Sequence, residues 1–226
     1  MIIKVFADTI CGWCFIGHHN LNLALKDFPN SKIKVEHVPF QLNPDMPQEG
    51  IARNKYLEIK FGGKEYAAPM YENMNHKAKE AGIDLNLDII GKTPNTTLSH
   101  LLIILSEKFN IQNEMKQKIY EAYFINGQDI GERDILIKIG NDLKIDKITI
   151  EKFFNLENIN KVNSYNSLAR NKNINGVPFY EIGKPPNTSD SSPATSNSQI
   201  EIDNSCIQDG GTQMCYDRQS QRYGNN

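Results

Sequence analysis

The sequence predicts an α/β fold in which a helical block interrupts a strand-bearing domain. Residues 2–7 (IIKVFA) are short, β-branched and aromatic, which is typical of a buried strand. After Cys11, apolar residues recur at helical spacing as far as Phe28, and residues 32–40 (KIKVEHVPF) alternate like a second strand. These segments form a strand–helix–strand unit. Strand character returns only after Gly176 (NGVPFYEIG), so the helices in between are predicted to be an insertion.

Helical patterns dominate the middle of the chain, after a turn-rich link with two prolines (QLNPDMPQEG). In GQDIGERDILIKIGNDL, acidic residues come first and an apolar stripe follows at Ile135, Leu136, Ile139 and Leu143. The charges of another segment, EMKQKIYEAY, are typical of a solvated helix face. We expect helices near residues 51–61, 64–81, 94–109, 112–126, 131–142, 149–156 and 158–171.

These patterns divide the chain into four parts. Residues 1–45 form the first part of the α/β domain, 46–157 the helical insertion, and 158–183 a return helix with a last strand. Residues 184–226 differ, because the stretch NTSDSSPATSNS consists almost entirely of small polar residues. We expect an atypical, flexible tail there.

Composition argues against several classes of function. The chain has 226 residues and a formal charge of −2, which does not suggest a nucleic-acid or membrane-surface partner. No apolar run approaches the ~20 residues that span a bilayer. The first residues, MIIKVFAD, show no export signal. We therefore expect a cytoplasmic location, where thiols are kept reduced.

Two of the four cysteines, Cys11 and Cys14, lie three positions apart at the predicted turn from strand into helix. This placement is typical of a redox pair. A zinc or iron–sulfur site would need two further ligands, and Cys206 and Cys215 do not form a second close pair. The redox interpretation is therefore favoured over a metal site and over two inert thiols, and no metal is expected.

The position of Cys11 suits it to attack a disulfide. At the start of a helix, unpaired backbone N–H groups and the helix dipole favour the thiolate, which is the nucleophile. We therefore expect a lowered pKa for Cys11. Cys14 lies one turn further on the same helix face, so it can resolve the mixed disulfide that Cys11 forms.

With these features the chain resembles the DsbA-like, FrnE-type branch of the thioredoxin superfamily. The similarity extends over residues 1–180 and is carried by DTICGWCFIG, VPFQLNPDMPQEG, NTTLSH, IYEAYFINGQDIGERDIL and GVPFY. It implies a thioredoxin-like fold with an all-helical insertion domain, and a thiol–disulfide oxidoreductase activity. It also implies that Cys11 is the nucleophile and Cys14 the resolving thiol.

The resemblance further implies a substrate-binding loop that ends in a cis-proline and faces the cysteines. By motif this residue is Pro178, preceded by Val177. Proline has no N–H, so the neighbouring backbone, supplied by Val177, is free to pair with an extended substrate. An ordinary strand start is the alternative. Trp13, between the two cysteines, is a further candidate for contact with substrate.

The C-terminal part departs from this family. Such proteins continue with a second hairpin strand and a final amphipathic helix, which residues 184–226 do not supply convincingly. We expect these elements to be absent or replaced, for example by a strand at SQIEI. Cys206 and Cys215 are either an auxiliary redox pair or, as favoured here, incidental thiols.

Four other residues lie close to the predicted site in the sequence or in the predicted fold. His18 is expected to be a solvated helix residue, although it could influence Cys14. His100 is expected either to face a cleft between domains or to be a satisfied residue at a helix interface. Phe40 and Gln41 follow the second strand and are expected to pack under the site.

Three functions are consistent with these features. The first is a reductase or isomerase of protein or small-molecule disulfides, with a disulfide-containing substrate, thioredoxin or glutathione as redox partner, and no tightly bound cofactor. The second is a glutathione-dependent isomerase or kappa-type glutathione transferase. Those relatives typically have serine at the position of Cys11, so the two cysteines favour the first function. The third is an inactive remnant.

Overall fold

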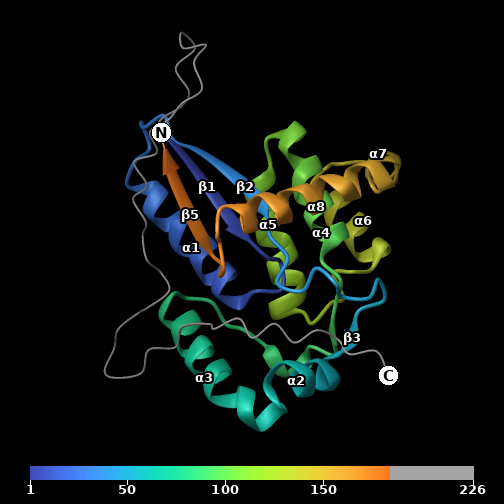
Figure 1. Ribbon diagram of the computed structural model, residues 1–226. Coiled ribbons are helices and arrows are strands. Elements are labelled where there is room, and N and C mark those ends of the chain that lie inside the picture. The colour runs from blue at the N-terminus through green and yellow to red at the C-terminus, as the bar shows by residue number, and fades with distance from the viewer. Residues whose placement is uncertain (184–226) are drawn as a thin grey trace.

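The computed structural model describes residues 1–183 (Figure 1). It shows a mixed α/β protein in which a small sheet lies among eight α-helices of the described residues. The expectations for residues 184–226 lie outside the described part of the chain. They include the strand at SQIEI, the replaced C-terminal elements and the roles of Cys206 and Cys215.

The main sheet contains the strands that the sequence predicts. Strands β1 (Ile2–Ala7), β2 (Lys34–Pro39) and β5 (Phe179–Gly183) lie in the order β2-β1-β5. β1 and β2 are parallel, and β5 is antiparallel to β1. A parallel pair needs a crossover connection, and helix α1 (Gly12–Lys26) supplies it. The predicted strand–helix–strand unit is therefore confirmed.

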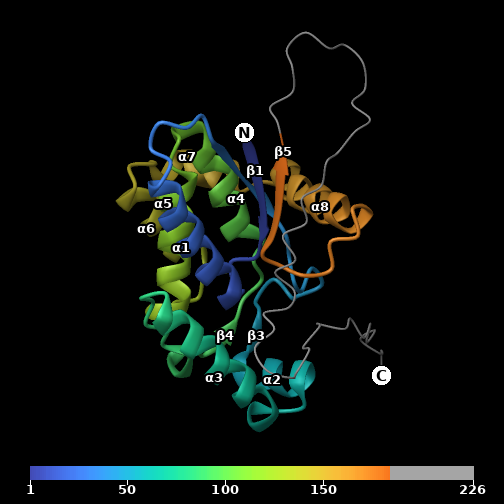
Figure 2. The ribbon, with the colours of Figure 1, turned by 90° about the vertical axis from the view of Figure 1, so that its left-hand side faces the viewer.

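Helices cover both faces of this sheet (Figure 2). Side chains alternate along β1, so Ile3 and Val5 join the core on the side of α1, while Phe6 packs with Ala169 of α8 (Leu156–Asn171). Both sides of β1 are thus covered by helices, which explains why its sequence is apolar almost throughout.

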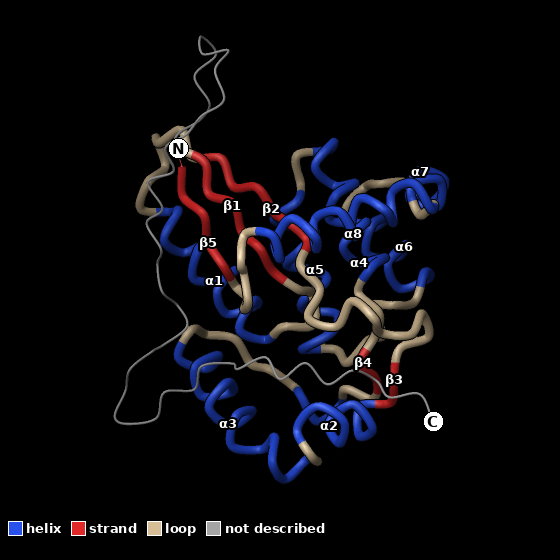
Figure 3. The backbone as a smooth tube through the Cα atoms, in the orientation of Figure 1, coloured by secondary structure: helices blue, strands red, loops and turns tan. Residues whose placement is uncertain are grey.

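The segment between β2 and α8 is mainly helical, as predicted, and Figure 3 shows its helices to the right of the main sheet and below it. Its longer helices are α2 (Arg53–Phe61), α3 (Lys64–Glu80), α4 (Thr97–Ser106), α5 (Gln112–Tyr120), α6 (Arg133–Asp142) and α7 (Lys147–Phe153). The short ones are η1 (Leu87–Ile89), η2 (Glu107–Phe109) and the π-helical η3 (Glu121–Ile125).

One feature of this segment was not predicted. Strands β3 (Ile51–Ala52) and β4 (Lys92–Thr93) form a two-stranded antiparallel pair. Each has two residues, too few for an alternating pattern to appear in the sequence. The domain boundaries that we predict after residues 45 and 157 stay predictions.

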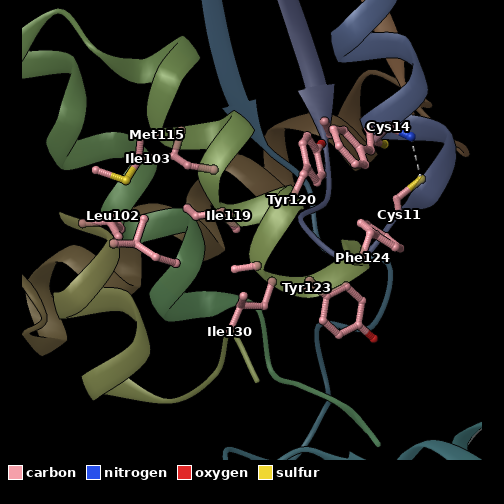
Figure 4. Close-up of a cluster of buried hydrophobic side chains, with 14 of the residues drawn as sticks. Cys11, Cys14, Leu102, Ile103, Met115, Ile119, Tyr120, Tyr123, Phe124 and Ile130 are labelled. Atoms are coloured by element: carbon pink, nitrogen blue, oxygen red, sulfur yellow. Dashed lines mark hydrogen bonds between the residues drawn. The ribbon is translucent and has the colours of Figure 1, made fainter. Parts of the chain in front are cut away.

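The helical segment and the α/β part share one apolar core (Figure 4). Leu102 of α4 and Ile119 of α5 lie in the same cluster as Val5 of the sheet and Phe15 of α1. The ring of Phe15 stacks on that of Tyr120, with 5.0 Å between centroids. The first turns of α1 therefore lie inside this shared core. No helix among residues 1–183 has the length and apolar content that a membrane span requires.

We predict that Leu102→Ala destabilises the protein by about 2–5 kcal/mol, because Leu102 is 0 % exposed and its loss leaves a cavity in the shared core. Urea denaturation measures the free energy of unfolding. Leu23→Ala on α1, where the side chain is 45 % exposed, is the matched control and is expected to change stability by about 0.5 kcal/mol or less. A loss below about 1 kcal/mol for Leu102→Ala would contradict this account of the core.

Candidate active site

Cys11 lies at the N-terminus of α1, at the end of the turn that follows β1. It is the N-cap residue, with φ −96° and ψ 110°, and its Sγ accepts a hydrogen bond from the backbone N–H of Cys14 at 3.3 Å (Figure 4). Its own N–H donates to the backbone oxygen of Asp8. The sulfur is thus placed at the positive end of the helix dipole, where a thiolate is stabilised.

The two sulfurs lie in different environments. Both cysteines are free thiols; Cys11 is 7 % exposed and Cys14 1 %. Burial raises the pKa of Cys14 well above its usual value, and the hydrogen bond and charge of Cys11 raise it further. A backbone hydrogen bond from Asp8 and the charge of Lys116 act in the opposite direction on the pKa of Cys14. The deeper thiol is therefore protonated at neutral pH.

The proline loop meets the first cysteine. The Val177–Pro178 peptide bond is cis, and the Cys11 thiol donates to the backbone oxygen of Val177 at 3.5 Å. Gly17 of α1 makes this approach possible, because an added Cβ there would lie 3.0 Å from Cγ of Pro178 and 2.4 Å from the hydroxyl of Tyr180. The structure therefore brings Val177 and Pro178 to the cysteine pair.

Trp13, the third candidate for substrate contact, lies on the first turn of α1. It is half-buried and packs against the shared core. Its role, like the roles of Val177 and Pro178, stays a prediction.

Asp8, which the sequence analysis did not single out, organises the turn before Cys11. Its buried carboxylate accepts from the N–H of Leu42 at 2.7 Å and pairs with Nε2 of His100 at 3.2 Å. Its backbone oxygen accepts from the hydroxyl of Tyr120 at 3.3 Å. The signal for it in the sequence is a polar residue directly after a buried strand. His100 is thus a satisfied, buried residue of α4, in agreement with the second of its two expected roles.

Gln41 links the loop after β2 to two helices. Its N–H and side-chain oxygen both bond the side chain of Asn166 on α8, at 2.8 and 2.7 Å. Its side-chain amide donates to the hydroxyls of Thr96 and Thr97. Phe40 is buried in the second apolar cluster, on the α8 side of the sheet. Both residues are packed, as expected.

The expectation that His18 is solvated is wrong. The residue is 2 % exposed, and its ring lies 5.7 Å from that of Tyr120 and 6.0 Å from that of His37. The side-chain amide of Asn22 hydrogen-bonds its Nε2 at 3.2 Å. Burial, with the charge of Lys116, lowers the pKa of His18 to about 3, so the ring is neutral. The sequence of α1 does not show that α5 covers this face of the helix.

Lys116 of α5 is likewise buried rather than solvated, at 2 % exposed. Its Nζ lies 3.2 Å from Nδ1 of His37, and burial lowers the pKa of Lys116 to about 8. Burial and the Lys116 charge also hold the pKa of His37 well below its usual value. The signal in the sequence is spacing, since Lys116 lies three and four positions before the buried Ile119 and Tyr120 and therefore on the apolar face.

Potential metal ligands do not gather at this site. Within residues 1–183, no group of three or more His, Cys, Asp or Glu side chains is arranged to hold a metal ion.

Comparison with known proteins gives a consistent result. Residues 2–200 match the family model described as DSBA-like thioredoxin domain. The fold is similar to that of a probable DsbA oxidoreductase, SCO1869, from Streptomyces coelicolor, with a TM-score of 0.70, 20 % identity and coverage of 80 % of this chain and 79 % of the other.

Two further solved structures share the fold. The cytosolic disulfide reductase DsbM from Pseudomonas aeruginosa, solved with GSH, has a TM-score of 0.61, 14 % identity and coverage of 80 % and 86 %. A 2-hydroxychromene-2-carboxylate isomerase has a TM-score of 0.64, 14 % identity and coverage of 81 % and 86 %. At these identities the likeness shows a common fold, the DsbA-like thioredoxin fold that the sequence predicts.

The buried neutral imidazole of His18 predicts a specific pH dependence of stability. Its pKa is about 3 in the folded protein, below the ordinary value of 6.5 that applies to the unfolded chain. Between these values the unfolded chain binds a proton that the folded protein does not, so stability is full above pH 6.5 and falls as the pH decreases. Between pH 6.5 and 4.5 the free energy of unfolding should decrease in both proteins. We expect this decrease to be smaller by about 2 kcal/mol in His18→Gln than in the parent.

Urea denaturation across this pH range measures the difference. His76→Gln on α3, where the side chain is 70 % exposed, is the control and should follow the parent. Equal slopes for the parent and His18→Gln would show that the ring is not buried in its neutral form.

Proposed function

The chain belongs to the DSBA-like thioredoxin domain family, and from this premise we propose that it is a thiol–disulfide oxidoreductase with Cys11 as nucleophile and Cys14 as resolving thiol. One observation carries the proposal. The Cys11 sulfur lies at a helix N-terminus, bonded to the N–H of Cys14 and next to the backbone oxygen of Val177. The helix N-terminus and the N–H of Cys14 favour a thiolate at Cys11. Cys14 lies within reach of that sulfur, and Val177 offers backbone groups for a substrate.

The proposed reaction has two steps. The Cys11 thiolate attacks one sulfur of a substrate disulfide, and the other substrate sulfur leaves with the electron pair of the broken bond. Cys14 then loses its proton and attacks Cys11, which releases the second substrate thiol and leaves a Cys11–Cys14 disulfide. Cys11 takes the first step because it is the more exposed sulfur. The backbone of Val177 would pair with an extended peptide, with Trp13 and Pro178 as further contacts for that peptide.

The proposed role is reduction or isomerisation of protein or small-molecule disulfides in the cytoplasm, as an FrnE-type protein. No tightly bound cofactor is proposed; the oxidised pair would be returned to dithiol by glutathione as co-substrate or by thioredoxin. The support is a similar fold in a protein described as a cytosolic disulfide reductase and solved with GSH.

A second candidate is a glutathione-dependent isomerase, favoured by the similar fold of the 2-hydroxychromene-2-carboxylate isomerase. In that reaction glutathione supplies the thiol, and a second protein thiol is not needed. The buried Cys14 next to Cys11 has a role only in dithiol chemistry, so the oxidoreductase is the better supported candidate.

We predict that Cys11→Ser reduces insulin no faster than the background rate of free thiols, because the nucleophile is gone. Cys14→Ser keeps the first step and loses the second, so it should accumulate a covalent mixed disulfide with substrate or glutathione, which intact-protein mass spectrometry detects. The control is Cys206→Ser/Cys215→Ser, which removes two other thiols and should keep the parent's activity.

An inactive parent, or a Cys11→Ser variant as active as the parent, would rule out the proposed function. Isomerase activity that requires glutathione and survives Cys14→Ser would instead favour the second candidate.

A further inference from the structure

Lys116 is a buried cation beside the redox pair that the proposed two-step reaction does not use. It is 2 % exposed and lies on α5, in the layer that packs against α1 and β2. Lysine is rarely buried to this degree without an anionic partner, because removing its charge from water costs several kcal/mol. Its presence in the shared core therefore needs a physical reason.

No carboxylate among residues 1–183 lies within 4.0 Å of the Lys116 ammonium. Its hydrogen-bond partner is Nδ1 of His37 on β2, at 3.2 Å. Because the pKa of His37 is far below neutral, this imidazole is uncharged and accepts the bond without cancelling the lysine charge. The positive field of Lys116 is therefore available to other groups in the core.

The groups that face Lys116 come from several elements. Tyr120 of α5 has its ring centroid 5.9 Å from the ammonium. The same ring stacks on Phe15, the residue after Cys14, and lies 5.7 Å from the ring of His18, one turn after Cys14 on α1. His18 is neutral, and burial raises the pKa of Tyr120, so neither is an anion at neutral pH. An ionised thiol, that of Cys14 more than that of Cys11, would raise the pKa of Lys116.

A small cavity borders Lys116. It has a volume of about 10 Å³, roughly the room of one water molecule, and its lining mixes Thr9, His37 and His100 with apolar residues. The carboxylate of Asp8 is next to His100 but is engaged by it and by the N–H of Leu42. The cavity therefore brings no carboxylate to the lysine.

We propose that Lys116 is a positioning residue for the resolving step, and that its ammonium group, held by the neutral His37, is the counter-charge of the Cys14 thiolate. The inference rests on the proposed function. In that step the Cys14 thiol loses its proton and the sulfur lone pair attacks Cys11. The bond between Cys11 and the substrate sulfur breaks, and that sulfur leaves with the electron pair and takes up a proton. Lys116 stabilises the buried anion while it exists.

The simpler alternative is that Lys116 fills space with its aliphatic stem. Lys116→Met distinguishes the space-filling role from the counter-charge role, because methionine has an unbranched side chain of similar length and no charge. Replacing a buried charge by an apolar side chain of similar volume is often neutral or stabilising. A purely structural lysine would therefore be replaceable without effect on the chemistry, whereas a counter-charge would not. Lys118→Met is the matched control, since Lys118 lies two positions along α5 with its side chain 52 % exposed.

Each protein carries Cys206→Ser/Cys215→Ser, so that Cys11 and Cys14 are its two thiols. The experiment mixes each reduced protein with dithiobis(nitrobenzoate) and follows release of its coloured thiolate in a stopped-flow instrument. Attack by Cys11 releases the first equivalent, and attack by Cys14 releases the second. Each unit of increase in the Cys14 pKa lowers its thiolate fraction tenfold and raises the nucleophilicity of the thiolate about threefold, for a net loss of about threefold.

We expect the second phase of Lys116→Met to be at least about threefold slower at pH 7, with a pH profile shifted to higher pH. The first phase should change less, and Lys118→Met should match the parent in both phases.

A second phase with the parent's rate and pH profile in Lys116→Met would overturn this inference. The proposed function would still stand as long as the parent shows both phases and reduces insulin. A parent that releases no second equivalent would instead count against the proposed function itself.

Discussion

The packing of α5 and η3 against the first turns of α1 is the contact on which the rest of the site depends. The stack of Phe15 on Tyr120, 5.0 Å between centroids, is at its centre. Cys14 lies in the same apolar cluster as these rings and is 1 % exposed, and the same layer covers His18. The helical segment therefore forms part of the environment of the buried thiol. It sets the polarity in which the second thiol ionises, whereas the α/β part alone places the first thiol at a helix N-terminus.

Close approach of three separate parts of the chain to α1 makes the site, and small residues permit it. Gly12, between the two cysteines, is packed against the thioether of Met74 on α3, so that a Cβ there would lie 2.3 Å from the sulfur. Gly17, one and a half turns further, admits Pro178 and Tyr180 from the strand side. α1 is thus contacted at one glycine by the helical segment and at the other by the proline loop. Cys11, directly before the first of these glycines, is 7 % exposed.

The parts of this structure that could be predicted are those with a local signal. The strand–helix–strand unit, the cysteine pair and the proline loop each depend on periodicity or on a motif within a few residues. The missed features depend on packing between distant segments: Asp8 with His100, 92 positions apart, and Lys116 with His37, 79 positions apart. A charge at position 116 is typical of a solvated face, although the spacing from Ile119 and Tyr120 places it on the apolar one. Where hydrophobic spacing predicts that a helix position is buried and its charge predicts that it is solvated, only the position of the neighbouring helices decides between the two.

The contrast between the two thiols is what a disulfide exchange reaction requires of its protein. The attacking sulfur must react as an anion, and a helix N-terminus is a position that favours a thiolate. The resolving sulfur must stay protonated until the mixed disulfide forms, because a second standing thiolate beside the first would be repelled by it. Burial keeps Cys14 neutral, and the same burial makes its ionisation costly when it is finally needed. A cation in the same low-dielectric core, bonded to an uncharged imidazole, lowers that cost while leaving the resting state protonated. A carboxylate in place of His37 would neutralise the cation and remove this effect, so the neutral histidine is as much a part of the arrangement as the lysine.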